Sequence, residues 1–101
     1  MSSRLDLQSL FEELLGSRNV YFQPPSTIRM SYPAIVYERS RIDVDHADNQ
    51  AYFQHPKYTV TVIDPDPDSE IPGRIAKLPM CSFDRHFTSD NLNHDVFNLY
   101  F

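Results

Sequence analysis

Residues 57–64 read KYTVTVID, and this stretch decides the fold class. In an extended chain Tyr58, Val60 and Val62 lie on one face, and the two threonines between them lie on the other. Aromatic and β-branched residues at a period of two predict a strand with one face in the core. The remainder of the sequence must therefore supply a layer that covers this face.

A helix near the N-terminus is the first candidate for that layer. Between residues 3 and 15 the apolar side chains recur at helical spacing: Leu7, Leu10, Phe11, Leu14 and Leu15. A serine before them can cap the start, and Gly16 stands where a helix C-terminus favours a left-handed residue. A second, shorter helix is expected over residues 69–78, where Pro79 ends it.

Four further segments are expected to be strands: 20–22, 32–40, 80–87 and 95–101. The first is expected at a sheet edge because two prolines follow it. Polar, turn-forming residues predict loops over 43–52 and 88–94. The order of helix, three strands, helix and two strands predicts a single α+β domain over residues 1–101. In this domain a mainly antiparallel sheet of about four to five strands packs against an N-terminal helix and a second short helix.

The composition excludes several classes of protein. The 101 residues suffice for one modest core, and with only 2 glycines there is no glycine-rich phosphate-binding loop. A formal net charge of −5 with scattered basic residues argues against binding nucleic acid through its phosphates. The single Cys81 favours a reducing compartment, and no stretch has the apolar length of a signal peptide or membrane span. We therefore expect a soluble protein made in the cytoplasm.

The stretch VIDPDPDSEIPG places four carboxylates at alternate positions: Asp64, Asp66, Asp68 and Glu70. An EF-hand loop that begins at Asp64 needs Gly at its sixth position and Glu at its twelfth, where this chain has Ser69 and Ile75. The prolines between the aspartates also keep the backbone extended. We therefore interpret the stretch as a rigid strand-to-helix connector in which Asp68 or Ser69 caps the helix. A metal site on the four carboxylates is the weaker alternative.

No other side chains form a convincing catalytic or metal-binding set. The four histidines match no ligand spacing and are expected on the surface: His46, His55, His86 and His94. Cys81 and His86 are five residues apart, which on a regular strand places them on opposite faces, so we do not expect a nucleophile and its base. Cys81 is instead expected to be a small buried residue.

Aromatic residues point to protein contacts. They make up 13% of the chain, more than a core of this size usually buries, and tyrosines are enriched at protein interfaces. The sequence therefore predicts a protein-contact surface, with self-association as one form of it. The apolar ending VFNLYF is expected to be docked in the sheet rather than frayed.

The order of several landmarks resembles that of the small tail terminator and tail-completion (head–tail joining) proteins of long-tailed bacteriophages. The N-terminal helix ends in LLG, and NVYFQPP, YPAIVYE and KYTVTVIDPDPDSEIP follow it. That family has a similar Tyr-Pro pair before an apolar strand, followed by a strand of the form Y-x-V-x-V and a helix. Here these are Tyr32-Pro33 and the strand that contains Tyr58, Val60 and Val62. The resemblance covers nearly the whole chain and includes no catalytic motif.

The resemblance implies a structural protein of the virion, without enzymatic activity or cofactors, that is assembled in the host bacterial cytoplasm. Copies of such a protein close into a homohexameric ring in the neck, at the head-proximal end of the tail tube. The ring ends tube polymerisation and joins the tube to the head connector. Its implied partners are further copies of the chain, the major tail tube protein and the connector (stopper) protein, with no membrane. DNA passes through its lumen without specific binding.

Candidate contact residues for such a ring are Tyr37, Arg39, Arg41, His46, Tyr52 and Phe53. The predicted loop over residues 43–54 is the segment expected to reach a partner. Three alternatives remain open from the sequence. The first is a head-closure (stopper) protein of the connector, the second a small metal-dependent hydrolase that uses Asp64, Asp66 and Asp68 with a histidine, and the third a monomeric ligand-binding module.

Overall fold

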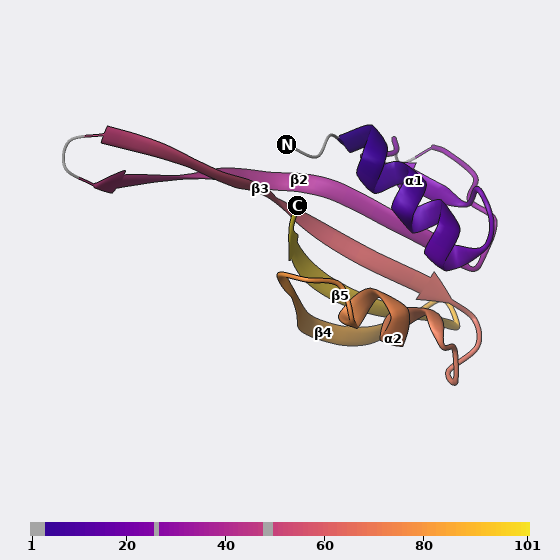
Figure 1. Cartoon of the computed structure of the whole chain (residues 1–101). Coiled ribbons are helices and arrows are strands. Elements are labelled where there is room, and N and C mark those ends of the chain that lie inside the picture. The colour runs from indigo at the N-terminus through magenta and orange to yellow at the C-terminus, as the bar shows by residue number, and fades with distance from the viewer. Residues whose placement is uncertain (1–3, 26, 48–49) are drawn as a thin grey trace.

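The computed structural model describes residues 4–25, 27–47 and 50–101, and the side chains of residues 41–56 fall outside the described part. Its elements follow the expected order of a helix, three strands, a helix and two strands (Figure 1). They are α1 (Arg4–Leu15), β1 (Val20–Phe22), β2 (Ala34–Ala47), β3 (Gln50–Asp64), α2 (Ile71–Ala76), β4 (Cys81–Ser89) and β5 (Leu92–Tyr100). Within the described residues, none of the helices combines the length and apolarity needed to cross a membrane.

The strands form one five-stranded sheet in the order β1-β2-β3-β5-β4. β1 runs parallel to β2, and the other three pairs are antiparallel. Both helices pack against the same face of the sheet, which gives a two-layer domain (Figure 1). The predicted α+β class is confirmed, and β1 lies at an edge as the prolines after it predicted.

The core lies between the two helices and this face of the sheet. Its buried residues are Leu7, Phe11, Leu15, Val20, Ile35, Tyr37, Tyr58, Val60, Val62, Ile71, Ile75, Phe97 and Leu99. The alternation of KYTVTVID is confirmed, because Tyr58, Val60 and Val62 are buried while the threonines between them are only half-buried. The buried face of this strand therefore contributes to the core that lies beneath the two helices.

The two helices differ in how well the sequence predicted them. α1 ends as expected, since Gly16 has a φ of 80° and its N–H donates to the carbonyl oxygen of Glu12 at 2.9 Å. The residues that would cap its start lie outside the described part. α2 is shorter than the predicted 69–78 and covers only Ile71–Ala76, with Pro72 in its first turn.

The predicted loop over residues 43–52 is wrong. β2 runs to Ala47 and β3 begins at Gln50, so these residues belong to a long antiparallel hairpin. Strand pairing is made by backbone groups, so a polar stretch can form a ladder where no core requires apolar side chains. The turn predicted over 88–94 likewise reduces to Asp90 and Asn91, whose φ values of 53° and 62° suit a two-residue hairpin turn.

The outer part of this hairpin, residues 41–47 and 50–56, is hereafter called the ribbon. In the part of the chain that the structure describes, it has two strands, because the pairing of β5 with β3 ends at Lys57 and the pairing of β1 with β2 ends at Tyr37. Figure 1 shows the ribbon projecting far beyond the rest of the domain, the body. The chain therefore extends over 50 × 24 × 22 Å, and its radius of gyration of 14.6 Å exceeds the roughly 13 Å of a compact domain of this length.

Burial along α1 predicts very different effects for two substitutions on the same helix. Phe11 is fully buried and packs edge-on against Tyr37, with ring centroids 5.1 Å apart, whereas Leu5 is 65% exposed. We expect Phe11→Ala to lower the free energy of unfolding by about 3–5 kcal/mol and Leu5→Ala by less than about 0.5 kcal/mol. Urea denaturation followed by circular dichroism measures both, and equal losses would contradict this packing of α1.

Candidate interaction surfaces

The acidic connector between β3 and α2 is held by its own carboxylates. Asp64 is 7% exposed, and its Oδ1 accepts a hydrogen bond from the backbone N–H of Asp66 at 2.8 Å. Oδ1 of Asp66 accepts in the same way from the N–H of Asp68 at 2.9 Å. From β5, the side-chain amide of Asn93 donates to the carbonyl oxygen of Asp64 at 3.1 Å. These bonds support the interpretation of the stretch as a rigid connector.

The start of α2 shows that the predicted helix cap is only partly right. The hydroxyl of Ser69 accepts a hydrogen bond from the N–H of Ile71 at 3.3 Å. The N-cap position itself is occupied by Glu70, and its side chain makes no cap hydrogen bond. Ser69 therefore satisfies one N–H of the first turn from the position before the cap.

The four carboxylates proposed as weak metal ligands have separate surroundings. Asp64 and Asp66 accept backbone hydrogen bonds, Asp68 is exposed, and Glu70 lies 3.6 Å from Arg74. In the part of the chain that the structure describes, no group of three or more His, Cys, Asp or Glu side chains is placed to hold a metal ion. No observation therefore favours the hydrolase alternative.

Tyr37 is a core residue, so its prediction as a contact residue is wrong. It is fully buried, and three neighbouring aromatic rings have centroids within 5.9 Å of its own. Its hydroxyl donates to Oε1 of Gln8 and accepts a hydrogen bond from the guanidinium of Arg4 at 3.3 Å. Because α1 supplies both partners of the phenol, the side chain is satisfied within its own chain. Burial raises the pKa of Tyr37.

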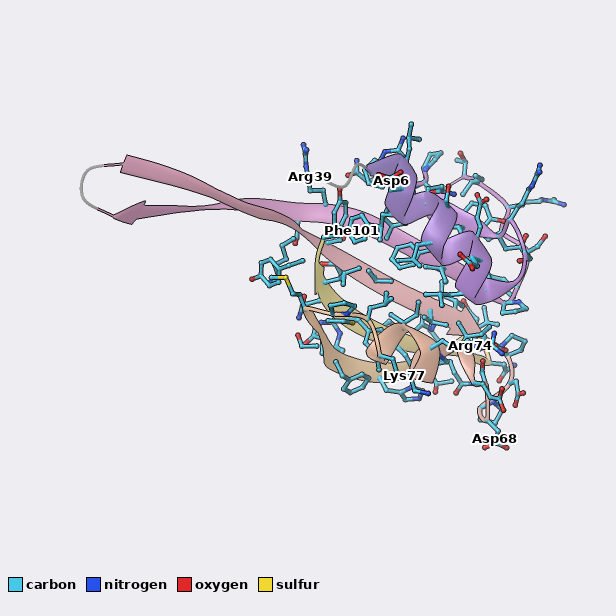
Figure 2. All side chains as sticks on the ribbon, viewed as in Figure 1. Asp6, Arg39, Asp68, Arg74, Lys77 and Phe101 are labelled. Atoms are coloured by element: carbon cyan, nitrogen blue, oxygen red, sulfur yellow. The ribbon has the colours of Figure 1, made fainter. Side chains whose placement is uncertain are left out.

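The remaining predicted contact residues lie on or beside the ribbon. Arg39 is exposed and pairs with Tyr58 shortly before the strands leave the body, where Figure 2 labels it. Four further residues belong to the strands of the ribbon: Arg41, His46, Tyr52 and Phe53. Their side chains lie outside the described part, so their role as contact residues stays a prediction.

The edge strand β4 contains a β-bulge that the sequence did not reveal. Phe83 pairs with Phe97 and Arg85 pairs with Val96, so Asp84 is an extra residue on this strand. An extra residue shifts the alternation of side chains between the two faces by one position. Face assignments that count residues across Asp84 are therefore reversed.

Cys81 and His86 share a face because of this bulge, so the prediction of opposite faces is wrong. They pair with Leu99 and Asp95, which are four residues apart on β5. Four residues of strand still separate the two side chains by about 13 Å, too far for a nucleophile and its base. Cys81 is half-buried instead of fully buried, and burial raises the pKa of its thiol.

Two cross-strand pairs between β4 and β5 were missed by sequence reasoning. Nδ1 of His86 lies 2.8 Å from Oδ1 of Asp95, directly opposite it in the ladder. The ring of Phe87 stacks on His94 with centroids 4.5 Å apart. His86 is exposed, as predicted, but His94 is half-buried. Both pairs follow from the strand register, which cannot be counted from the sequence across an unrecognised bulge.

An apolar groove lies where the C-terminal end of β5 meets α1. Its volume is about 160 Å³, and it is lined by Leu10, Leu78, Pro79, Met80, Leu99, Tyr100 and Phe101. The N–H of Tyr100 donates to the carbonyl oxygen of Met80 at 3.1 Å, which ties two of its walls together. Phe101 is half-buried and lies near the place where β2 and β3 leave the body (Figure 2). The expectation of a docked C-terminus is confirmed.

Comparison of the chain with protein-family models, with curated proteins and with solved structures finds no match. What the protein does must therefore be inferred from its own residues and geometry. Two surfaces are available for this purpose. One is the ribbon, beside which the described residues place no third strand, and the other is the groove, whose wall residue Met80 is 57% exposed.

The connector geometry predicts different effects for two aspartates only four residues apart. Asp64→Ala removes a buried acceptor and leaves the N–H of Asp66 without its partner, which we expect to cost about 1–3 kcal/mol of unfolding free energy. Asp68→Ala alters an exposed side chain and is expected to cost less than about 0.5 kcal/mol. Thermal or urea unfolding with and without a chelator tests this, since a metal site predicts losses for both variants and a chelator effect.

The buried phenol of Tyr37 predicts a pH effect as well as a stability effect. Tyr37→Phe leaves Oε1 of Gln8 without its donor and is expected to cost about 1–2 kcal/mol at neutral pH. Because burial raises the pKa of Tyr37 above its ordinary 10.0, the folded protein holds this proton more tightly than the unfolded chain does. The resulting stability is present in full below about pH 10 and is lost as the pH rises through the raised pKa.

Unfolding free energies measured at several pH values up to the alkaline range check this prediction. The alkaline loss of stability should be smaller in Tyr37→Phe than in the wild type. Tyr32→Phe is the matched control, because Tyr32 is 39% exposed, and it should leave the alkaline loss unchanged. An identical alkaline slope in all three proteins would overturn the assignment to Tyr37.

Proposed function

We propose that this chain is a structural protein of a bacteriophage virion, a tail terminator-like ring subunit that caps the head-proximal end of the tail tube. In this role it ends tube polymerisation, joins the tube to the head connector and performs no enzymatic reaction. Its partners are further copies of itself, the major tail tube protein and the connector protein, with DNA passing through the lumen. The protein therefore acts in the neck of the virion, after assembly in the bacterial cytoplasm.

The observation that carries the proposal is the ribbon. An isolated two-stranded hairpin is marginally stable in water, and strands usually need a third strand or a packed layer. Among the described residues the body supplies neither to the ribbon, since pairing with β5 ends at Lys57. A segment of this kind is stabilised when another protein covers it. The body itself has a buried core, which α1 and α2 cover on one face of the sheet.

Two further features agree with this function. The sequence landmarks of the tail terminator family follow one another in this chain from the N-terminal helix to α2, and the two-layer α+β body accommodates all of them. The net charge of −5 suits a passage that DNA crosses without adhering. A head-closure (stopper) protein shares these features, so binding to tail tubes, as opposed to the head connector, separates the two roles.

The central experiment compares the wild type with a variant that lacks the ribbon. Replacing residues 42–56 by Asn-Gly joins the paired residues Arg41 and Lys57 through a two-residue turn and leaves the body intact. We expect the wild type to form a ring with a mass several times 11.8 kDa and to bind tail-tube ends, and the variant to be a folded monomer. Native mass spectrometry and electron microscopy of mixtures with tail tubes give both readouts.

The matched control keeps the ribbon at full length and changes only the two residues between its strands, as Asp48→Asn with Asn49→Gly. It should assemble like the wild type. Circular dichroism must show that all three proteins are folded. A wild type that stays monomeric at its highest soluble concentration and ignores tail tubes would refute the proposed function, and binding to the connector alone would assign the stopper role.

A further inference from the structure

The groove and the ribbon are complementary in size. The volume of the groove, about 160 Å³, is close to that of an apolar cavity of roughly 150 Å³ that holds one benzene molecule. The groove therefore has room for a single aromatic ring. The sequence of the ribbon supplies two such residues, Tyr52 and Phe53, on β3. From these observations we infer that the groove of one copy receives the ribbon of a second copy, with Tyr52 as the inserted side chain.

The ribbon of the same chain is not placed to fill this groove. Tyr100, which lines the groove, pairs with Lys57 at the root of the ribbon. From that root the two strands run away from the body and stay paired as far as Ala47 and Gln50, with one register shift between Ile42 and Val44 (Figure 1). Folding the outer ribbon back onto its own root would break this pairing. A second copy presents the same segment without this cost.

Charge selects Tyr52 over its neighbour. Tyr52 is the register partner of Asp45, so the two residues share one face of the ribbon, whereas Phe53 belongs to the other face. On the body, the exposed Lys77 directly precedes Leu78 of the groove, and Figure 2 labels it beside α2, which it follows in the chain. With Tyr52 in the groove, Asp45 of the ribbon approaches Lys77 of the neighbouring body.

The other charged residues of the ribbon and around the groove favour the same orientation. The ribbon contains two aspartates, Asp43 and Asp45, and one arginine, and is therefore slightly acidic. Beside the groove lie Arg74 of α2 and Lys77, the residue directly after α2, and Arg74 is already bound to Glu70 and to the carbonyl oxygen of Leu14. Of these two cations of the described residues, Lys77 is the one that remains available. On the α1 side the exposed Glu13 lies one turn from Leu10, which disfavours the reverse orientation of the acidic ribbon.

The contact is heterologous, because ribbon and groove are different surfaces of the same chain. Repetition of such a contact closes a ring if the rotation between copies allows it. The inference therefore rests on the proposed ring subunit and names the two surfaces that would join its copies. It differs from a reciprocal exchange of ribbons, which would produce a closed dimer.

Disulfide trapping tests the inference on the full chain. In a Cys81→Ser background, Tyr52→Cys combined with Met80→Cys places one thiol on the ribbon and one on the exposed wall of the groove. Under mild oxidation we expect a series of cross-linked oligomers that extends beyond the dimer. The matched control combines Tyr52→Cys with Leu5→Cys. Like Met80, Leu5 is apolar and exposed (65%), but it does not line the groove.

A charge exchange provides the second measurement. Lys77→Glu and Asp45→Lys should each weaken self-association at least about tenfold, and the double variant should recover most of it. Sedimentation equilibrium measures all four proteins, with circular dichroism to confirm that they are folded.

The outcomes separate this inference from the proposed function. Cross-linked oligomers larger than the dimer, together with recovered self-association in the double variant, support the docking of the ribbon in the groove. A dimer alone, or cross-linking no stronger than in the Leu5 control, would overturn it. If the wild type still forms a ring in that case, the ring subunit proposal stands and another surface closes the ring.

Discussion

The antiparallel ladder between β2 and β3 is the constraint on which both halves of the molecule depend. Its inner part pairs Tyr37 with Val60 beneath α1, and its outer part, beyond the pair of Arg41 and Lys57, is the ribbon. Because side chains alternate along a ladder, a slip of one residue would turn the core face of the slipped strand to solvent. The packing of the body therefore fixes the register, and the same register sets the direction in which the ribbon leaves. A bulge near residue 40 lies at the transition, where the hydroxyl of Ser40 donates to the carbonyl oxygen of Lys57 at 3.0 Å.

The body could be predicted from the sequence because its elements obey simple periodicities. KYTVTVID shows a period of two and α1 a period close to four, and both periods result from one apolar layer facing another. The ribbon could not be found in this way, because it projects beyond the two layers of the body. A signal was nevertheless present, since Ile42 and Val44 alternate with charged neighbours over the supposed loop. The polarity of the stretch predicts a loop, whereas strand pairing depends on backbone groups.

The candidate surfaces were predicted less well, for two physical reasons. The burial of Tyr37 depends on Gln8 and Arg4, which reach it from a helix about thirty residues earlier in the chain, and no local pattern encodes that contact. The faces of β4 depend on the extra residue Asp84, and one unrecognised bulge reverses every assignment beyond it. The acidic connector was predictable because its hydrogen bonds join residues two apart.

The chemistry of the ribbon also indicates how it can be recognised. A projecting pair of strands offers unpaired backbone groups along both edges, which is a hazard for uncontrolled strand addition. The sequence places Arg41, Asp43 and Asp45 along β2, and register shifts interrupt the pairing on both sides of Ser40 and Asp43. Charged side chains and bulges are the devices by which natural edges resist pairing with further strands. These features disfavour recognition through an edge, so the proposed docking uses a face of the ribbon.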